Sequence, residues 1–129
     1  MRPFSERRLK RSPLRDVAAM LRSLHYAAYS AIMEQEFDRH RKDQRLEEWA
    51  ETWTYYSSRL FLNGYSENMG TYNFIPESKQ DYHILLDTFL LEKAVYELNF
   101  ELTHRQHLVL IPLRGIRSIL ERSGPGNNK

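Results

Sequence analysis

The feature that most limits the fold of this chain is a long stretch without helix-breaking residues. None of its five glycines precedes Gly64, and no proline lies between Pro13 and Pro76, so residues 14–63 contain neither. Glycine and proline are the residues that most often interrupt regular structure. We therefore expect long helices over this part of the chain.

The first helix is predicted to begin at Pro13, because Ser12 is a suitable N-cap and proline suits the first helical position. Behind it, apolar residues recur at intervals of three and four, which predicts one apolar stripe along a helix that reaches roughly Glu36. The stretch 38–43 contains no apolar residue. It predicts a turn before a second helix.

The second helix carries large side chains at intervals of three and four, and we expect this seam to lie in the core: Leu46, Trp49, Trp53, Tyr56 and Leu60. Two glycines and a proline fall within residues 63–79, which predicts a loop. A third helix is expected over residues 81–103. Because it has apolar residues on two faces, we expect it to be the central helix.

A short last helix is predicted over residues 113–122, and residues 123–129 should be a disordered tail. No convincing alternation of apolar and polar residues indicates a strand. The predicted fold class is all-α, with three long helices and a short C-terminal helix. The expected organisation is a basic N-terminal arm over residues 1–12, a helical domain over 13–122 and the tail.

Composition narrows the classes of protein to consider. A length of 129 residues fits one domain. The absence of cysteine excludes disulfides, thiolate nucleophiles and cysteine-ligated metals, which agrees with an expected cytoplasmic location. A net charge of +2 is too balanced to indicate nucleic-acid binding. No apolar run is long enough to span a bilayer, so we expect no membrane partner.

The basic residues gather at the N-terminus. Residues 1–15 carry six arginines and lysines against one glutamate. Such an arm can bind phosphates or nucleic acid through its guanidinium groups. A solvated lead-in to the first helix is the favoured interpretation, and nucleic-acid binding ranks last among the functions considered.

Catalytic signatures are absent from the sequence. There is no glycine-rich phosphate loop, nucleophile elbow, zinc-protease motif or calcium loop. His104 and His107 lie three residues apart near Glu101, a spacing that would suit a metal if the helix continued through them. A fraying helix end is the favoured interpretation, because histidines there complement the helix dipole. No metal site is predicted.

Charged residues on the third predicted helix allow two interpretations. Lys93, Glu97 and Glu101 follow one another at intervals of four. The favoured interpretation is a solvent-facing ladder in which Lys93 pairs with Glu97. The alternative is a polar pocket wall with Tyr96 beside Glu97, suited to sugar hydroxyls.

Two regions of the chain resemble a known family. The stretch R-R-L-K-R-S-P-L-R-D-V-A-A-M-L-R-S over residues 7–23 is one of them. The other is L-L-E-K-A-V-Y-E-L over residues 90–98, continued by I-P-L-R-G-I over 111–116. In their residues, their order and their separation, these regions resemble the C-terminal part of bacterial maltokinases, including those fused to trehalose synthase. The resemblance covers nearly the whole chain.

The resemblance implies the helical C-lobe of an aminoglycoside-phosphotransferase-like kinase. Such kinases make maltose 1-phosphate from maltose and ATP, on the route from trehalose to α-glucan and glycogen. In the family, the nucleotide lobe, the catalytic Asp loop and the magnesium-binding Asp motif precede the stretch that opens here at Arg7. We therefore expect ATP and Mg²⁺ to be bound mainly by the missing part, and this chain to hold no cofactor and to be inactive alone.

The family pattern also assigns expectations to three residues. Asp16 matches the Asp of the family's D-V-A helix start, which implies structural support of the catalytic loop. Tyr96 and Glu97 match a Y-E pair on the acceptor-sugar side, which implies contacts to maltose. Ala19 stands where the family more often has glycine, and we expect little effect.

Two hypotheses of function follow. The first is the C-terminal helical portion of a maltokinase, catalytically incomplete, whose partners are maltose and either the missing kinase lobe or a trehalose synthase domain. The chain would then be an excised piece, a truncated reading frame or one part of a split protein. The alternative is a stand-alone helical interaction module that forms a homo-oligomer or binds another protein.

Overall fold

The computed structural model describes residues 13–39, 42–69 and 78–123, and within them every element is helical, as predicted. The long helices are α2 (Pro13–Arg39), α3 (Gln44–Met69) and α4 (Lys79–His104). A short 3₁₀ turn, η1 (Gln106–Leu108), leads into α5 (Leu110–Ser123). Ser12, the basic arm and the tail from residue 124 lie outside the described residues.

Local polar contacts explain where the helices begin. Ser78 caps α4, because its hydroxyl accepts a hydrogen bond from the Asp81 amide at 3.4 Å. A carboxylate oxygen of Asp43 accepts one from the Arg45 amide at 3.0 Å, at the entry to α3. Pro112 lies in the first turn of α5, where its missing N–H costs no intrahelical hydrogen bond.

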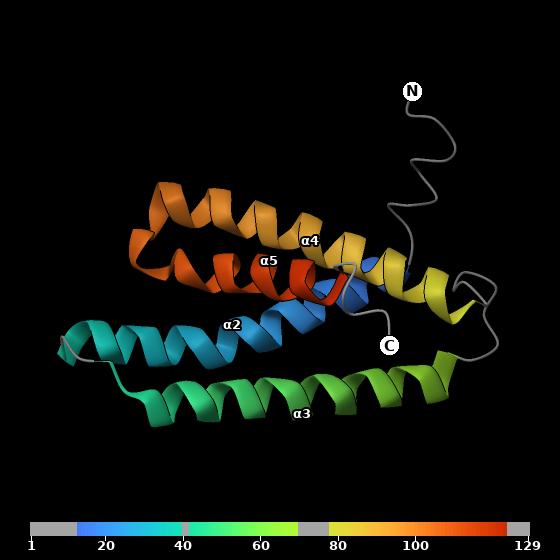
Figure 1. Cartoon of the computed structure of the whole chain (residues 1–129), viewed down its shortest axis with the longest axis horizontal. Helices are drawn as coiled ribbons and strands as arrows, with labels where there is room; N and C mark the ends of the chain where they lie inside the picture. The colour runs from blue at the N-terminus through green and yellow to red at the C-terminus, as the bar shows by residue number, and fades with distance from the viewer. Residues whose placement is uncertain (1–12, 40–41, 70–77, 124–129) are drawn as a thin grey trace.

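Helix α2 is the central helix of the fold. Figure 1 shows it between α3 on one side and the pair formed by α4 and α5 on the other. The expectation that the helix over residues 81–103 is central is therefore wrong. That helix, α4, packs on α2 and α5 but leaves Val95, Tyr96 and Leu102 more than half exposed.

The core consists of two apolar clusters, one along each half of α2. The N-terminal half of α2 packs against α4 and α5 through Leu14, Val17, Ala18, Leu21, Leu86, Phe89, Leu90 and Ile119. The C-terminal half packs against α3, η1 and α5 through Ala28, Tyr29, Ile32, Met33, Ala50, Leu108 and Ile111. Both clusters use one apolar stripe of α2, first at positions 14, 17, 18 and 21 and then at 28, 29, 32 and 33, so this helix runs along the whole core.

Two expectations for the second helix are wrong. Residues 63–69, predicted as part of a loop, continue α3, and its apolar contacts there outweigh the cost of one internal glycine, Gly64. The predicted core seam is mostly exposed: Trp49 is 58% exposed, Tyr56 62% and Leu60 74%. The small residue Ala50 is fully buried instead, which lets α3 approach α2 closely.

None of the described helices is both long and apolar enough to cross a membrane.

Candidate functional site

A buried ion pair joins α2 to α4. The Nη2 atom of Arg22 lies 2.6 Å from Oε2 of Glu97, and Nε donates to both carboxylate oxygens at 3.1 and 3.2 Å. Only 5% of the Arg22 side chain and 12% of the Glu97 side chain are exposed. Paired, charge-assisted hydrogen bonds of this kind hold both groups in one orientation. The pair therefore fixes α4 against α2, although 75 residues separate its members.

Gly115 brings the backbone of α5 against this pair. A Cβ atom added at Gly115 would lie 2.3 Å from Nη1 of Arg22 and 2.9 Å from Cζ. Both distances are well inside van der Waals contact. Glycine is needed here for space, so that three helices can close around one guanidinium group.

His25 completes the surroundings of Arg22 on α2. Its Nδ1 atom lies 2.8 Å from Nη1 of Arg22. Because a guanidinium group has only donors, Nδ1 is the acceptor and the neutral imidazole carries its proton on Nε2. Burial, then the positive charges of Arg22 and Arg114, lower the pKa of His25 from 6.5 to about 3. His25 thus stays neutral at pH 7 and holds Arg22 by accepting its hydrogen bond.

The pKa of His25 predicts a loss of stability in mild acid. When the chain unfolds, His25 regains its ordinary pKa near 6.5 and binds a proton that the folded state excludes. The contribution of neutral His25 to the free energy of unfolding is complete above pH 6.5, and it falls as the pH drops toward 3. Between pH 7 and pH 5 the wild-type free energy of unfolding should fall by about 2 kcal/mol more than that of His25→Gln, measured with urea. His83→Gln, which removes an exposed imidazole, is the control, and an equal pH response of wild type and His25→Gln would contradict the assignment.

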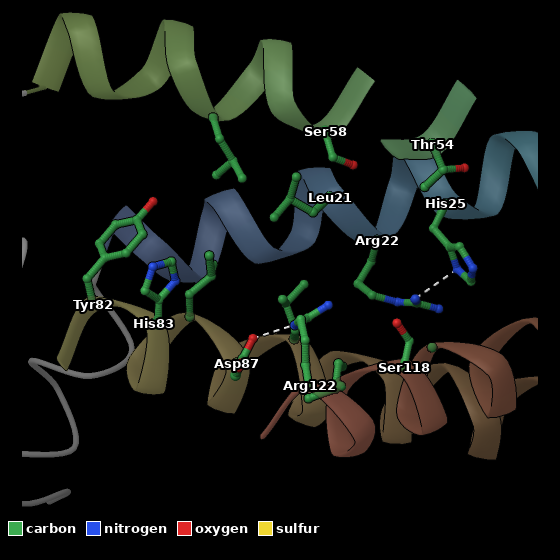
Figure 2. Close-up of a pocket in the computed structure, with 15 residues that line it drawn as sticks. Leu21, Arg22, His25, Thr54, Ser58, Tyr82, His83, Asp87, Ser118 and Arg122 are labelled. Carbon is green, nitrogen blue, oxygen red and sulfur yellow. Dashed lines mark hydrogen bonds and ion pairs between the residues drawn. The ribbon is translucent and has the colours of Figure 1, made fainter. Parts of the chain in front are cut away.

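A pocket of about 350 Å³ opens beside the ion pair. Figure 2 shows Arg22 and His25 of α2 at one end, and Asp87 of α4 with Arg122 of α5 toward the other. Arg122 donates to Asp87 at 2.7 Å. Five aliphatic side chains form most of the apolar lining: Leu21, Leu62, Leu86, Leu90 and Ile119. The volume suits a small molecule, and the few polar groups would orient it.

A second buried charge lies further along α4. Glu101 is only 1% exposed, and its Oε1 atom accepts hydrogen bonds from Arg105 at 2.7 and 3.1 Å. Its Oε2 atom and the Tyr26 hydroxyl are buried without a hydrogen-bond partner among the described residues. Burial and the negative charge of Glu101 raise the pKa of Tyr26, so the hydroxyl remains protonated. The Tyr26 hydroxyl and Glu101 therefore lie close enough to interact with each other.

The structure separates the two residues expected to contact a sugar. Glu97 faces Arg22, whereas Tyr96 lies 64% exposed on the outer surface of α4. Neither lines the 350 Å³ pocket. The favoured ladder of Lys93 with Glu97 is wrong, because the Lys93 ammonium lies 5.2 Å from the centre of the Tyr96 ring and Glu97 binds α2.

The other singled-out residues lie apart from the ion pair. Asp16 is exposed in the first turn of α2, where a carboxylate complements the helix dipole. His104 donates a hydrogen bond from Nδ1 to the Phe100 carbonyl, 3.0 Å away, at the end of α4. Within the described residues no three His, Asp or Glu side chains come together as metal ligands.

Sequence reasoning missed three members of the network: Arg22, His25 and Gly115. The sequence feature that could have indicated burial of Arg22 is its position beside the apolar stripe of α2, next to the buried Leu21. Nothing in the spacing connects it to Glu97. No protein-family model matches this chain.

Proposed function

We propose that this chain is the C-terminal helical part of a maltokinase-type sugar kinase and supports the acceptor-sugar side of that enzyme. One observation carries the proposal. The two regions that carry the resemblance supply Arg22 from the first and Glu97 and Gly115 from the second, and these residues meet around one guanidinium group. Sequence similarity that converges on one buried polar cluster is expected where that cluster serves a site, because buried charges are costly to keep.

The contacts of Glu97 and Tyr96, the two residues expected to bind the sugar, support a different role for each. Both oxygens of Glu97 accept hydrogen bonds from Arg22, so Glu97 acts as a positioning residue that holds α4 in place. The exposed ring of Tyr96 remains available for stacking on a sugar. In the family, the groups that hold ATP and Mg²⁺ belong to the nucleotide lobe and its catalytic loops, so we assign no step of phosphoryl transfer to this chain.

A chimaeric enzyme tests this function. The chain would replace the corresponding C-terminal part of a bacterial maltokinase, and formation of maltose 1-phosphate would be followed by ³¹P NMR. We expect turnover from the chimaera and none from the isolated chain. A chimaera that folds, as judged by circular dichroism and ATP binding, yet never phosphorylates maltose would contradict the proposal.

Within that chimaera, Glu97→Gln should raise the KM for maltose by roughly tenfold while the KM for ATP stays unchanged, because only the acceptor side loses its support. Asp87→Asn is the matched control, since it breaks the ion pair with Arg122, which lines the same pocket away from Glu97. If the two substitutions changed the KM for maltose equally, Glu97 would have no specific role in positioning the sugar site.

A further inference from the structure

Helix α3 has one face without a partner. Among the described helices, α2 alone makes an extended contact with α3. On the opposite side, Trp49, Tyr55, Tyr56 and Leu60 are all more than half exposed. Large apolar side chains gathered on one surface mark a site of interaction, because their exposure to water is unfavourable.

A regular stripe of exposed residues runs along this face. Its members, which we call the α3 stripe, are Arg45, Trp49, Thr52, Tyr56, Leu60, Asn63 and Glu67. Successive members lie 4, 3, 4, 4, 3 and 4 residues apart, so the spacing is the same when read from either end. Intervals of three and four are typical of residues that pack between two helices. The symmetry about Tyr56 favours an antiparallel pair of identical helices.

The charges of the α3 stripe suit such a pair. Arg45 stands at one end and Glu67 at the other, and no ion pair joins either of them to another residue in the described ranges. In an antiparallel pair centred on Tyr56, Arg45 lies opposite Glu67 of the partner subunit. Both ends of the interface would then carry complementary charges around an aromatic centre, the arrangement common in protein interfaces.

Both aromatic side chains of the α3 stripe contact a neighbouring ring, and Tyr56 lies edge-on to Tyr55 with centroids 5.3 Å apart. The rings of Trp49 and Trp53 stack with centroids 6.4 Å apart. Arg59 lies over the Tyr55 ring and donates a hydrogen bond to its hydroxyl at 3.1 Å. Fixed side chains lose little entropy on binding, and Trp and Tyr dominate the binding energy of many interfaces.

We propose that the chain forms a two-fold homodimer in which the α3 stripes of two copies pack antiparallel with Tyr56 at the symmetry axis. The interface is isologous, so each copy contributes the same surface. It uses residues outside the Arg22 network and does not depend on the proposed kinase role.

Sedimentation equilibrium of the full chain tests the assembly. The mass should approach twice 15.5 kDa and fall on dilution. Tyr56→Glu places two like charges at the axis and should yield monomer. Tyr96→Glu is the matched control, because Tyr96 is 64% exposed against 62% for Tyr56, and it should remain dimeric. A chain that is monomeric at about 100 μM, or a dimer that Tyr56→Glu leaves intact, would overturn the proposal.

Charge exchange tests the antiparallel register. Arg45→Glu or Glu67→Arg alone should weaken the dimer by roughly tenfold, and the double exchange should restore it. Because the chain has no cysteine, Tyr56→Cys should also form an intermolecular disulfide on mild oxidation, whereas Tyr96→Cys should not. Failure of the double exchange to restore affinity, or equal cross-linking of the two cysteine variants, would overturn this register.

Discussion

Replacing Arg22 by methionine should lower the free energy of unfolding by about 3–5 kcal/mol, the usual cost of removing one member of a buried ion pair. The cost arises because Glu97, with 12% of its side chain exposed, keeps its charge without its partner. His25 loses the donor to its Nδ1 atom in the same change. Urea unfolding at pH 7 measures the effect directly.

The double variant Arg22→Met/Glu97→Leu separates the pair from its surroundings. Removing both charges together should cost much less than the sum of the single substitutions, because neither charge is left buried alone. Arg117→Met is the matched control, since its ion pair with Glu121 is exposed and should contribute less than about 1 kcal/mol. Additive single effects would mean that the two side chains do not interact as described.

Replacing Gly115 by alanine should destabilise the protein by about 2–3 kcal/mol, because a Cβ atom there collides with the guanidinium group of Arg22. Arg22 cannot simply move aside, since Glu97 and His25 hold three of its nitrogen atoms. Thermal or urea unfolding checks the magnitude. In an Arg22→Ala background the penalty should largely disappear, because the colliding group is gone.

The chain supplies a matched control for this substitution. A Cβ atom at Gly64, within α3, would meet nothing within 4 Å. Gly64→Ala should therefore stabilise the protein by about 0.5–1 kcal/mol through its better helix propensity. Destabilisation of similar size at both glycines would show that close approach to Arg22 is not the reason for glycine at position 115.

Residues that break helices made much of the fold predictable. Pro13 marks the start of α2, and the predicted third helix differs from α4 by two residues at its start and one at its end. The centre of the fold was misplaced, because apolar periodicity shows that a helix has an apolar face without showing whether another helix covers it. Trp49 and Leu60 have the spacing of core residues and yet face away from α2.

The candidate site was harder to predict than the helices. Spacing along one helix identifies neighbours three or four residues away, so it paired Glu97 with Lys93. The true partner, Arg22, lies on another helix. Gly115 gave no signal either, because its role is to leave space for a side chain from a distant part of the sequence.

The separation of Arg22 and Glu97 by 75 positions in the sequence also implies an order of assembly. Helices α2 and α3 follow each other in the sequence and can dock early, whereas the ion pair must wait until α4 and α5 close a much longer loop. We therefore expect the ion pair to form late in folding, after the transition state. Arg22→Met should consequently act mainly by speeding unfolding, with little change in the folding rate.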